Sequence, residues 1–184
     1  MEDRKMTAAT QIPGYVAGTW NIDPVHSEVA FIVRHLGVSK VRGRFNTISG
    51  TIVTGEDPST SSVTAQIVAD SVDTKNEQRD GHVRSADFLH VEEHEHLTFT
   101  SSAVRIDGED VEIDGDLTLH GVTKAVTLTG ELGGFGDGPN SKVLGVSAST
   151  EIKRSDFGVG GGIPSAVVSD KIKIELDVEA QLQA

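Results

Sequence analysis

The chain has 184 residues, a length that fits one all-β domain and is enough to bury a substantial core. Its formal net charge of −12 argues against a nucleic-acid or anionic-membrane partner, because both require a basic face. It contains no cysteine, so disulfides, thiol catalysis and cysteine-bound zinc are excluded.

Side chains that favour strands dominate the composition. Val, Ile and Thr together make up 50 residues, whereas Leu contributes 10. Because β-branched side chains lose rotamer freedom in helices and pack well on a pleated surface, this balance predicts an all-β domain. We expect residues 1–18 to be a flexible N-terminal segment and residues 19–184 a single domain. Without an apolar run of signal-peptide or membrane-span length, we expect a cytoplasmic protein with no stable membrane insertion.

Alternation of apolar and polar residues predicts four strands in the first part of the chain, at residues 27–34, 41–45, 48–53 and 63–69. The same pattern predicts further strands at residues 97–103, 111–119, 126–129, 144–150 and 172–178. Asp107-Gly108 predicts a tight hairpin, because both residue types adopt positive φ at low cost.

The polar stretch at residues 71–89 is the longest part that does not alternate. Thr74 and Glu77 have capping-box spacing, which indicates a helix start, and Gly81 divides the helix so that Ser85 begins a second piece. We therefore predict a short helical insertion at about residues 74–91, laid across one end of the β structure; a solvated surface loop is the alternative.

Eight or nine strands with one apolar face each must close into a barrel or pair with a second sheet. Their inward residues are small, and a barrel of about eight strands is either filled or holds one small ligand. Gly43, Gly50 and Gly115 take inward positions, where a missing side chain leaves room for a bend or a ligand. The pattern favours an apolar tunnel in a closed antiparallel barrel, with a filled sandwich core as the alternative.

The histidines of the segment HVEEHEH are the only group that resembles a catalytic or metal site. His94 and His96 would share one strand face, with His90 nearby, but neutral histidines among glutamates are common on exposed loops and the H-E-x-x-H pattern is absent. The sequence has no G-x-S-x-G elbow and no complete nucleotide-binding glycine motif. We predict no catalytic residue, no metal site and no cofactor.

Four blocks in matching order resemble the YceI-like family of polyisoprenoid-binding proteins: WNIDPVHSEVAFIVRHLGVSKVRGRF, SVDTKNEQRDGHVRSADF, GDLTLHGVTKAVTL and IKRSDFG. The resemblance covers about residues 19–180. It implies an extended eight-stranded antiparallel lipocalin-like barrel that holds a polyprenyl quinone or polyprenyl phosphate, and it implies a homodimer. It further implies a role in transport, storage or stress response. This chain departs from the family at Leu89, where the family prefers Phe, and at His94-Glu95, where relatives often carry an aromatic–Pro pair.

Two groups of site residues follow from the alternation and from the resemblance. The predicted lipid-binding tunnel is lined by Val29, Phe31, Val33, Phe45, Ile52, Ile67, Phe88, Leu89, Phe99, Leu117, Val146, Phe157 and Ile174. The candidates for head-group contacts are the basic residues Arg34, His35, Arg79, Arg84 and Arg154. Two alternative functions stay open: a metal-dependent hydrolase or lyase that uses His90, His94 and His96, and a ligand-free interaction module.

Overall fold

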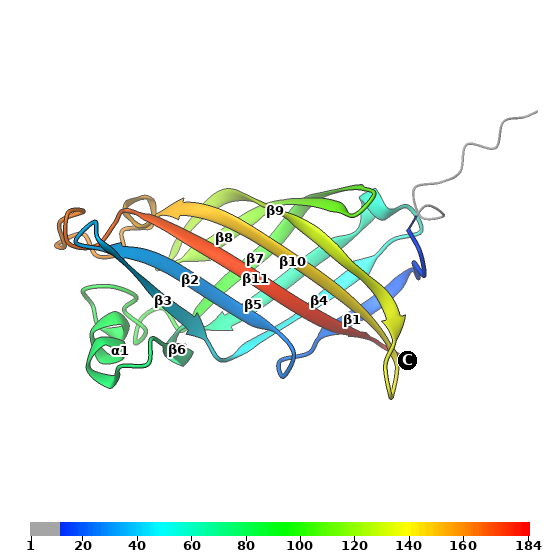
Figure 1. The fold of residues 1–184 in the computed structure, drawn as a ribbon, viewed down its shortest axis with the longest axis horizontal. Coiled ribbons are helices and arrows are strands. Elements are labelled where there is room, and N and C mark those ends of the chain that lie inside the picture. Colours follow the sequence, from blue (N-terminus) through cyan, green and yellow to red (C-terminus); the bar gives the residue numbers. More distant parts are fainter. Residues whose placement is uncertain (1–11) are drawn as a thin grey trace, which may run out of the picture.

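A computed structural model describes residues 12–184 and places most of them in strands (Figure 1). Six strands precede the helix: β1 (Gly18–Ile22), β2 (Glu28–His35), β3 (Ser39–Phe45), β4 (Ile48–Thr54), β5 (Ser62–Val68) and β6 (Val72–Asp73). The helix α1 (Glu77–Arg84) is followed by β7 (His96–Asp107), β8 (Asp110–Leu119), β9 (Val122–Asp137), β10 (Lys142–Lys153) and β11 (Lys171–Leu182). Short 3-10 turns lie at η2 (Pro58–Thr60), η3 (Ala69–Ser71) and η4 (Arg154–Phe157).

Eight of the strands close into an antiparallel barrel. They pair in the order β1, β4, β5, β7, β8, β9, β10 and β11, and β11 returns to β1 through the pair Trp20 and Leu182. Alternation explains the closure, because in β8 the residues Val111, Ile113, Gly115, Leu117 and Leu119 are buried while the residues between them are more exposed. The predicted eight-stranded antiparallel barrel is confirmed.

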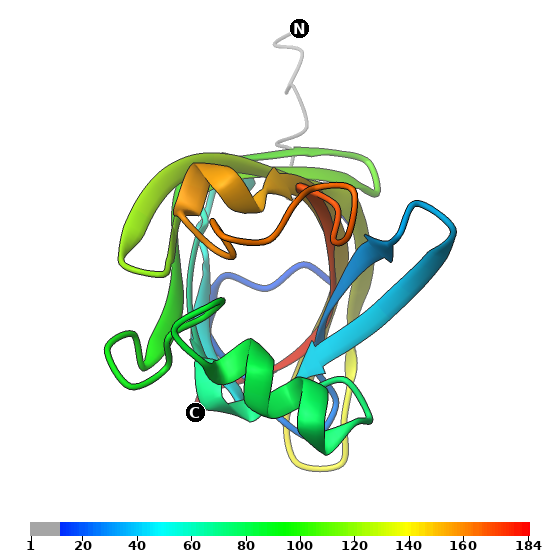
Figure 2. The ribbon, with the colours of Figure 1, turned by 90° about the vertical axis from the view of Figure 1, so that its left-hand side faces the viewer.

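The strands β2, β3 and β6 extend the wall at one end. β11 pairs with β1 near Ala180 and with β2 between Lys173 and Asp177. β1 and β2 therefore occupy successive lengths of the same edge of β11. The chain leaves the sheet between them, and the β2–β3 hairpin then stands away from the barrel axis (Figure 2). β6 adds only the pairs of Arg44 with Asp73 and of Phe45 with Val72.

The helical insertion lies within the predicted range but differs in detail. The cap of α1 is Asn76, whose side chain accepts a hydrogen bond from the Arg79 N–H at 2.9 Å, and not Thr74. Thr74 is buried and its N–H donates to Asp80 at 2.8 Å. Gly81 is tolerated inside one helix, and residues 85–95 form turns, so the predicted second helical piece is wrong.

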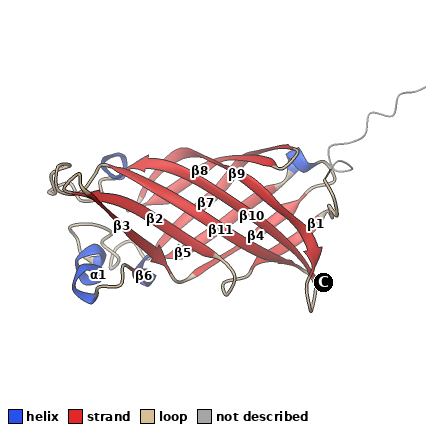
Figure 3. Cartoon of the chain, viewed as in Figure 1, coloured by secondary structure: helices blue, strands red, loops and turns tan. Residues whose placement is uncertain are grey.

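The two ends of the barrel are built differently (Figure 3). At the tryptophan end, Trp20, Ile22, Ile52, Leu144 and Ala180 form a buried cluster. The helix end carries α1, the turns of residues 85–95, the β2–β3 hairpin tip and the loop of residues 158–170.

The predicted N-terminal segment lies partly outside the described residues, which begin at residue 12. Within the described part, Ile12 is buried, and the Tyr15 hydroxyl donates to the Gly55 carbonyl at 2.6 Å. Burial raises the pKa of Tyr15. Residues 12–15 therefore lie against the tryptophan end of the barrel.

Candidate functional site: an apolar cavity inside the barrel

An apolar cavity of about 180 Å³ lies inside the barrel. Its lining contains one polar residue, Thr150, and no ionisable side chain among the residues that the structure describes. A cavity of this size with aliphatic and aromatic walls stays dry and accepts apolar molecules. The chemistry that the site offers is therefore binding by burial of hydrocarbon.

Register explains why the lining residues meet. Across β11 and β2, Ile174 is opposite Phe31 and Leu176 is opposite Val29. Across β7 and β8, Phe99 is opposite Leu117. Because side chains alternate between the two faces of a strand, each of these pairs adds two apolar groups to the same inner surface.

Two inward glycines make room for phenylalanine rings. A Cβ at Gly43 would overlap the ring of Phe31, its partner across the β2–β3 hairpin, and a Cβ at Gly115 would overlap Phe99. Gly50 packs against the backbone of β5 and the side chain of Ile22. The expectation that these glycines leave space for a ligand is therefore wrong, because the protein's own atoms occupy that space.

Most of the predicted tunnel residues line this cavity. Val33 and Phe157 do not: Val33 lies further along β2, opposite Val41, and Phe157 is buried with 1% of its surface exposed in η4. The residues in the lining are Val29, Phe31, Phe45, Ile52, Ile67, Phe88, Leu89, Phe99, Leu117, Val146 and Ile174.

The lining also contains residues that were not selected from the sequence. Alternation already placed many of them on inward faces, but Val83 of α1 and Val159 of the glycine-rich loop carry no such signal. The full set is Ile22, Ala30, Ile48, Val63, Ala65, Val83, Leu97, Ile113, Leu119, Val126, Leu128, Ala148, Thr150, Ile152, Val159, Ile172, Leu176 and Val178.

Turns form the cavity wall at the helix end. The Leu89 N–H donates to the Val83 carbonyl at 2.9 Å, which folds the segment after α1 back onto the helix. This turn directs Phe88 and Leu89 into the lining, where Phe88 also meets the ring of His82 edge-on with centroids 5.0 Å apart.

Arg154 is committed to the loop of residues 158–170. It is 4% exposed, and its guanidinium donates to the carbonyls of Val159, Gly160, Ile163, Val168 and Ser169 at 2.6–3.2 Å. An arginine with every donor group engaged in this way holds the loop and has none to offer a lipid head group. The structure therefore places Arg154 in a structural position.

The remaining predicted head-group residues differ in how free their side chains are. Arg79 donates to the Thr74 hydroxyl and carbonyl, and Arg84 to the carbonyls of Asp70 and Val72. Arg34 and His35 are exposed at the β2–β3 hairpin, and across residues 12–184 no side-chain hydrogen bond or ion pair is recorded for either. Among the predicted head-group residues, those with free side chains are thus Arg34 and His35 of the hairpin.

The histidines assemble differently from the prediction. His90 and His94 meet His120, which sequence reasoning missed, whereas His96 lies in β7 and is not part of the cluster. His120 comes from the β8–β9 turn, 26 residues further along the chain than His94, so no local spacing reveals it.

Clear pKa shifts fall on the outside of the barrel. Hydrogen bonds from Arg105 and Thr127 lower the pKa of Asp114 to about 2. The Asp23 carboxylate raises the pKa of His26 and its own pKa is lowered by the same hydrogen bond. These groups lie away from the apolar lining and take no part in it. Among residues 12–184, no helix is long and apolar enough to cross a membrane.

Comparison with known proteins agrees with this architecture. Residues 20–180 match the family model described as a YceI-like domain. A curated relative from Escherichia coli, Protein YceI, is 41% identical over 172 residues, which cover 91% of this chain and 89% of the relative. A crystal structure of a Campylobacter jejuni YceI protein superposes with a TM-score of 0.75 at 32% identity, covering 82% of this chain and 90% of that one.

A more distant structure shares the fold. A polyisoprenoid-binding domain from Saccharophagus degradans, described as implicated in plant cell wall breakdown, superposes with a TM-score of 0.71 at 19% identity. The match covers 91% of this chain and 100% of that domain. The extent of the family-model match and the identity to the Escherichia coli relative lead to one conclusion: this chain belongs to the YceI-like domain family.

Proposed function

We propose that the barrel binds a long-chain polyisoprenoid, such as a polyprenyl quinone or polyprenyl phosphate, with its tail in the cavity. The observation that carries this proposal is the composition of the lining, in which Thr150 is the one polar residue. The Saccharophagus degradans domain of the same fold is described as polyisoprenoid-binding, which supports the same ligand class.

The energetics favour occupancy. An unfilled cavity of about 180 Å³ costs about 4 kcal/mol in lost packing, which a hydrocarbon guest restores. Each isoprene unit removes about five carbons from water, worth roughly 4 kcal/mol, so a few units offset the cost of association. The same arithmetic predicts weak discrimination between tail lengths, because an apolar slot separates homologues poorly.

We place the polar head group at the helix end, near the β2–β3 hairpin. Arg34 and His35 are the basic side chains with free donors there, and Lys40 faces Arg34 across the hairpin. A guanidinium is well suited to a phosphate, since its fork of donors matches two phosphate oxygens. Arg79 and Arg84 are already engaged with backbone carbonyls and make weaker candidates.

The hairpin tip supports a role in exchanging lipid with a membrane. Leu36 and Val38 are 57% and 80% exposed, and Leu36 holds a left-handed backbone with φ of 56°. An exposed apolar residue in a strained conformation calls for a functional reason. We infer that this tip touches the bilayer during transfer. Replacing Leu36 and Val38 with serine should slow lipid transfer between vesicles by about 10-fold or more and leave folding intact; an unchanged transfer rate would disprove this contact.

The direct test is mass spectrometry of an organic extract from tag-free protein purified without detergent. We expect a polyisoprenoid in near-stoichiometric amount. As a control, Phe99→Asp places a charge in the lining and should abolish retention in a variant that still folds. A blank extract, together with no uptake of polyprenyl lipid by the purified protein, would sink the proposal.

The other two functions fit the structure less well. An interaction module would have a filled core, whereas this barrel is hollow. A hydrolase or lyase that uses His90, His94 and His96 fits less well, because His96 lies outside the histidine cluster and the cavity lining offers no ionisable side chain to a substrate. We therefore propose a carrier or storage protein and not an enzyme.

The predicted homodimer and cytoplasmic location stay predictions. Light scattering coupled to size-exclusion chromatography tests the first, with twice the mass of the 19.5 kDa chain expected. Immunodetection in separated cytoplasmic and periplasmic fractions tests the second.

A further inference from the structure

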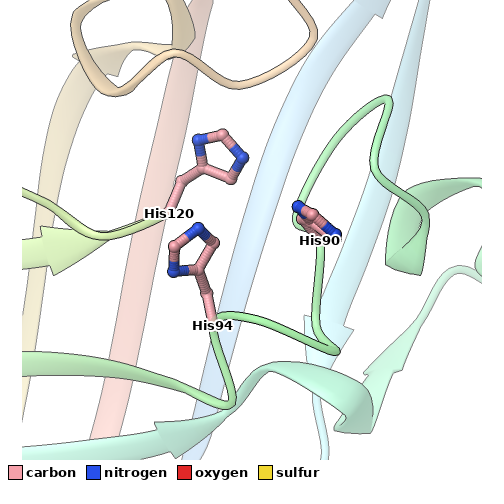
Figure 4. Close-up of side chains that lie close together, drawn as sticks. All are labelled: His90, His94 and His120. Atoms are coloured by element: carbon pink, nitrogen blue, oxygen red, sulfur yellow. The ribbon is translucent and has the colours of Figure 1, made fainter.

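Three imidazole rings converge at the helix end of the barrel (Figure 4). His90, His94 and His120 each offer one nitrogen, and these nitrogens lie within 4.8 Å of one another. The ring centroids of His94 and His120 are 4.8 Å apart, and those of His90 and His94 are 6.0 Å apart. All three side chains are partly buried, which distinguishes them from histidines that extend freely into solvent.

Two separate backbone segments hold this arrangement. The His94 N–H donates to the His90 carbonyl at 2.9 Å, and His90 has a left-handed backbone with φ of 50°, so a hydrogen-bonded turn brings the two residues together. His120 has a left-handed backbone with φ of 55° in the β8–β9 turn. The next residue is Gly121, where a Cβ would come within 2.8 Å of the His94 ring. The absence of that side chain lets the two segments meet.

One nitrogen of His120 has a hydrogen-bond partner that indicates which nitrogen holds the proton. His120 Nδ1 lies 3.1 Å from the Phe157 carbonyl oxygen, which only accepts hydrogen bonds, so the proton sits on Nδ1 and the lone pair on Nε2. The Glu93 carboxylate lies 3.6 Å from His90 Nδ1, near this nitrogen but beyond hydrogen-bond distance. Metal-binding histidines usually have this arrangement, in which a carbonyl or carboxylate holds the nitrogen opposite the metal.

We propose that His90, His94 and His120 bind a divalent transition metal ion, with zinc as the best match. Three imidazoles and one open position form a tetrahedral zinc site of the three-histidine type. In such a site the nitrogens lie about 3.4 Å apart, given zinc–nitrogen distances of about 2.1 Å. The rings therefore close by up to about 1.4 Å on binding, which side-chain rotation supplies.

The site would connect parts of the helix end that otherwise meet only through side-chain packing. His90 and His120 each follow a cavity-lining residue, Leu89 and Leu119. A bound ion would tie the turn of residues 90–94 to the β8–β9 turn and stiffen that part of the cavity wall. The proposal does not depend on the identity of the lipid, so its test is independent of lipid extraction.

A second group of potential metal-binding side chains is explained by ordinary ion pairs. Asp23, His26 and Glu179 also lie close together, but His26 is exposed and pairs with the carboxylates at 2.8 and 3.3 Å. These groups satisfy one another without an ion. In the His90 cluster, three imidazole rings lie close together, and none of the described carboxylates lies within the cluster to pair with all three.

The test is a titration of tag-free, metal-free protein with Zn²⁺ against a chromogenic chelator, with Co²⁺ as a spectroscopic probe. We expect one equivalent of Zn²⁺, a rise in Tm on binding, and the intense visible absorption of four-coordinate Co²⁺. His120→Gln and His94→Gln, from different segments, should each weaken Zn²⁺ binding at least about 10-fold. His96→Gln is the matched control, since it removes a neighbouring histidine outside the cluster.

Two outcomes would overturn the proposal. One is binding that His96→Gln weakens as much as His120→Gln does, which would indicate adventitious binding to surface histidines. The other is a pale, six-coordinate Co²⁺ spectrum in the wild-type protein, or no stoichiometric binding. If one variant fails to fold, as judged by circular dichroism, the other variant and the wild-type Co²⁺ spectrum still decide between these results.

Discussion

The two ends of the barrel close in different ways. At the tryptophan end, the fully buried Trp20 donates its indole N–H to Thr54 at 2.8 Å, and Thr54 donates to the Val16 carbonyl at 2.7 Å. Phe135 meets the rings of Trp20 and Tyr15 edge-on at 5.5 and 5.1 Å. The helix end instead has one polar eight-residue helix, turns and a glycine-rich loop.

Under the proposed function, the tryptophan end would maintain the stability of the barrel, and the helix end would admit and release the lipid. The tryptophan end combines barrel closure with dense aromatic packing, so it should open only when the whole barrel unfolds. The helix end has more turn and loop backbone, which is a property of segments that open locally. The proposed carrier would need one end that stays closed and one end that opens, and the two ends of the barrel differ in this sense.

The largest expected effect comes from breaking the tryptophan end. Trp20→Ala should lower the free energy of unfolding by about 3–5 kcal/mol, because it leaves a cavity and removes the indole hydrogen bond to Thr54. Urea denaturation measures it. Val25→Ala, at a side chain that is 83% exposed, is the control and should change stability by less than about 0.5 kcal/mol. A loss below about 1 kcal/mol for Trp20→Ala would contradict the assigned role of this end.

Removing the buried guanidinium should open the helix end locally. Arg154→Met leaves five loop carbonyls without their donor and should lower the opening free energy of residues 158–170 by about 2–3 kcal/mol. Hydrogen exchange monitored by mass spectrometry should show faster exchange in this loop and unchanged protection in β1. Equal acceleration at both ends would contradict the separation between them.

Replacing Gly43 in β3 tests whether the position of the Phe31 ring limits how much lipid the cavity can hold. Gly43→Ala displaces the Phe31 ring, which should cost about 1–2 kcal/mol and reduce the amount of bound lipid. Gly136→Ala is the matched control in β9, because the nearest atom to its added Cβ is 3.8 Å away on Val143. Lipid-to-protein ratios after native purification compare the two. Equal ratios would show that the Phe31 ring does not limit the occupied space.

Much of the barrel is predictable because its signal is local. Each wall strand has period-two alternation, and its apolar face must be buried, so the pattern predicts either a closed barrel or two packed sheets. The proposed ligand class comes from the resemblance to the family and not from the alternation. Alternation also identifies most of the lining, but it continues past the cavity, which is why Val33 is on the inward face yet outside the lining.

The features that could not be predicted from the sequence depend on contacts between loops. His120 joins His90 and His94 only because the β8–β9 turn lies against the turns after α1. Arg154 reads as a basic residue near a glycine-rich loop, and only the folded loop shows that its carbonyls surround the guanidinium. Thr74 matches the capping-box pattern, but Asn76 takes the cap because Thr74 is bonded to Asp80.

A smaller change tests whether α1 is the part that moves. Gly81→Ala fills open space on an exposed helix face and should stabilise α1 by about 0.5–1 kcal/mol. If lipid leaves past α1, its release measured by a fluorescent analogue should slow by a few-fold. Gln78→Ala is the control for altering an exposed side chain of α1 without removing a glycine. Higher protection of α1 with unchanged release would indicate exit past another segment.

Acid should have the smallest effect, acting through two carboxylates, Asp170 in the loop at the helix end and Asp114 on the outside of β8. Hydrogen bonds from the Ser155 N–H and hydroxyl lower the pKa of Asp170 at the helix end, and Arg105 and Thr127 lower that of Asp114 to about 2. A carboxyl with a lowered folded-state pKa stabilises the fold fully above its ordinary value of 3.8, and this contribution is lost as pH falls through the folded pKa. Asp114→Asn should therefore flatten the stability curve between about pH 4 and 2. Asp170→Asn should also flatten the stability curve, and it should speed hydrogen exchange in the loop of residues 158–170. If Asp170→Asn leaves this exchange unchanged, Arg154 alone holds the loop.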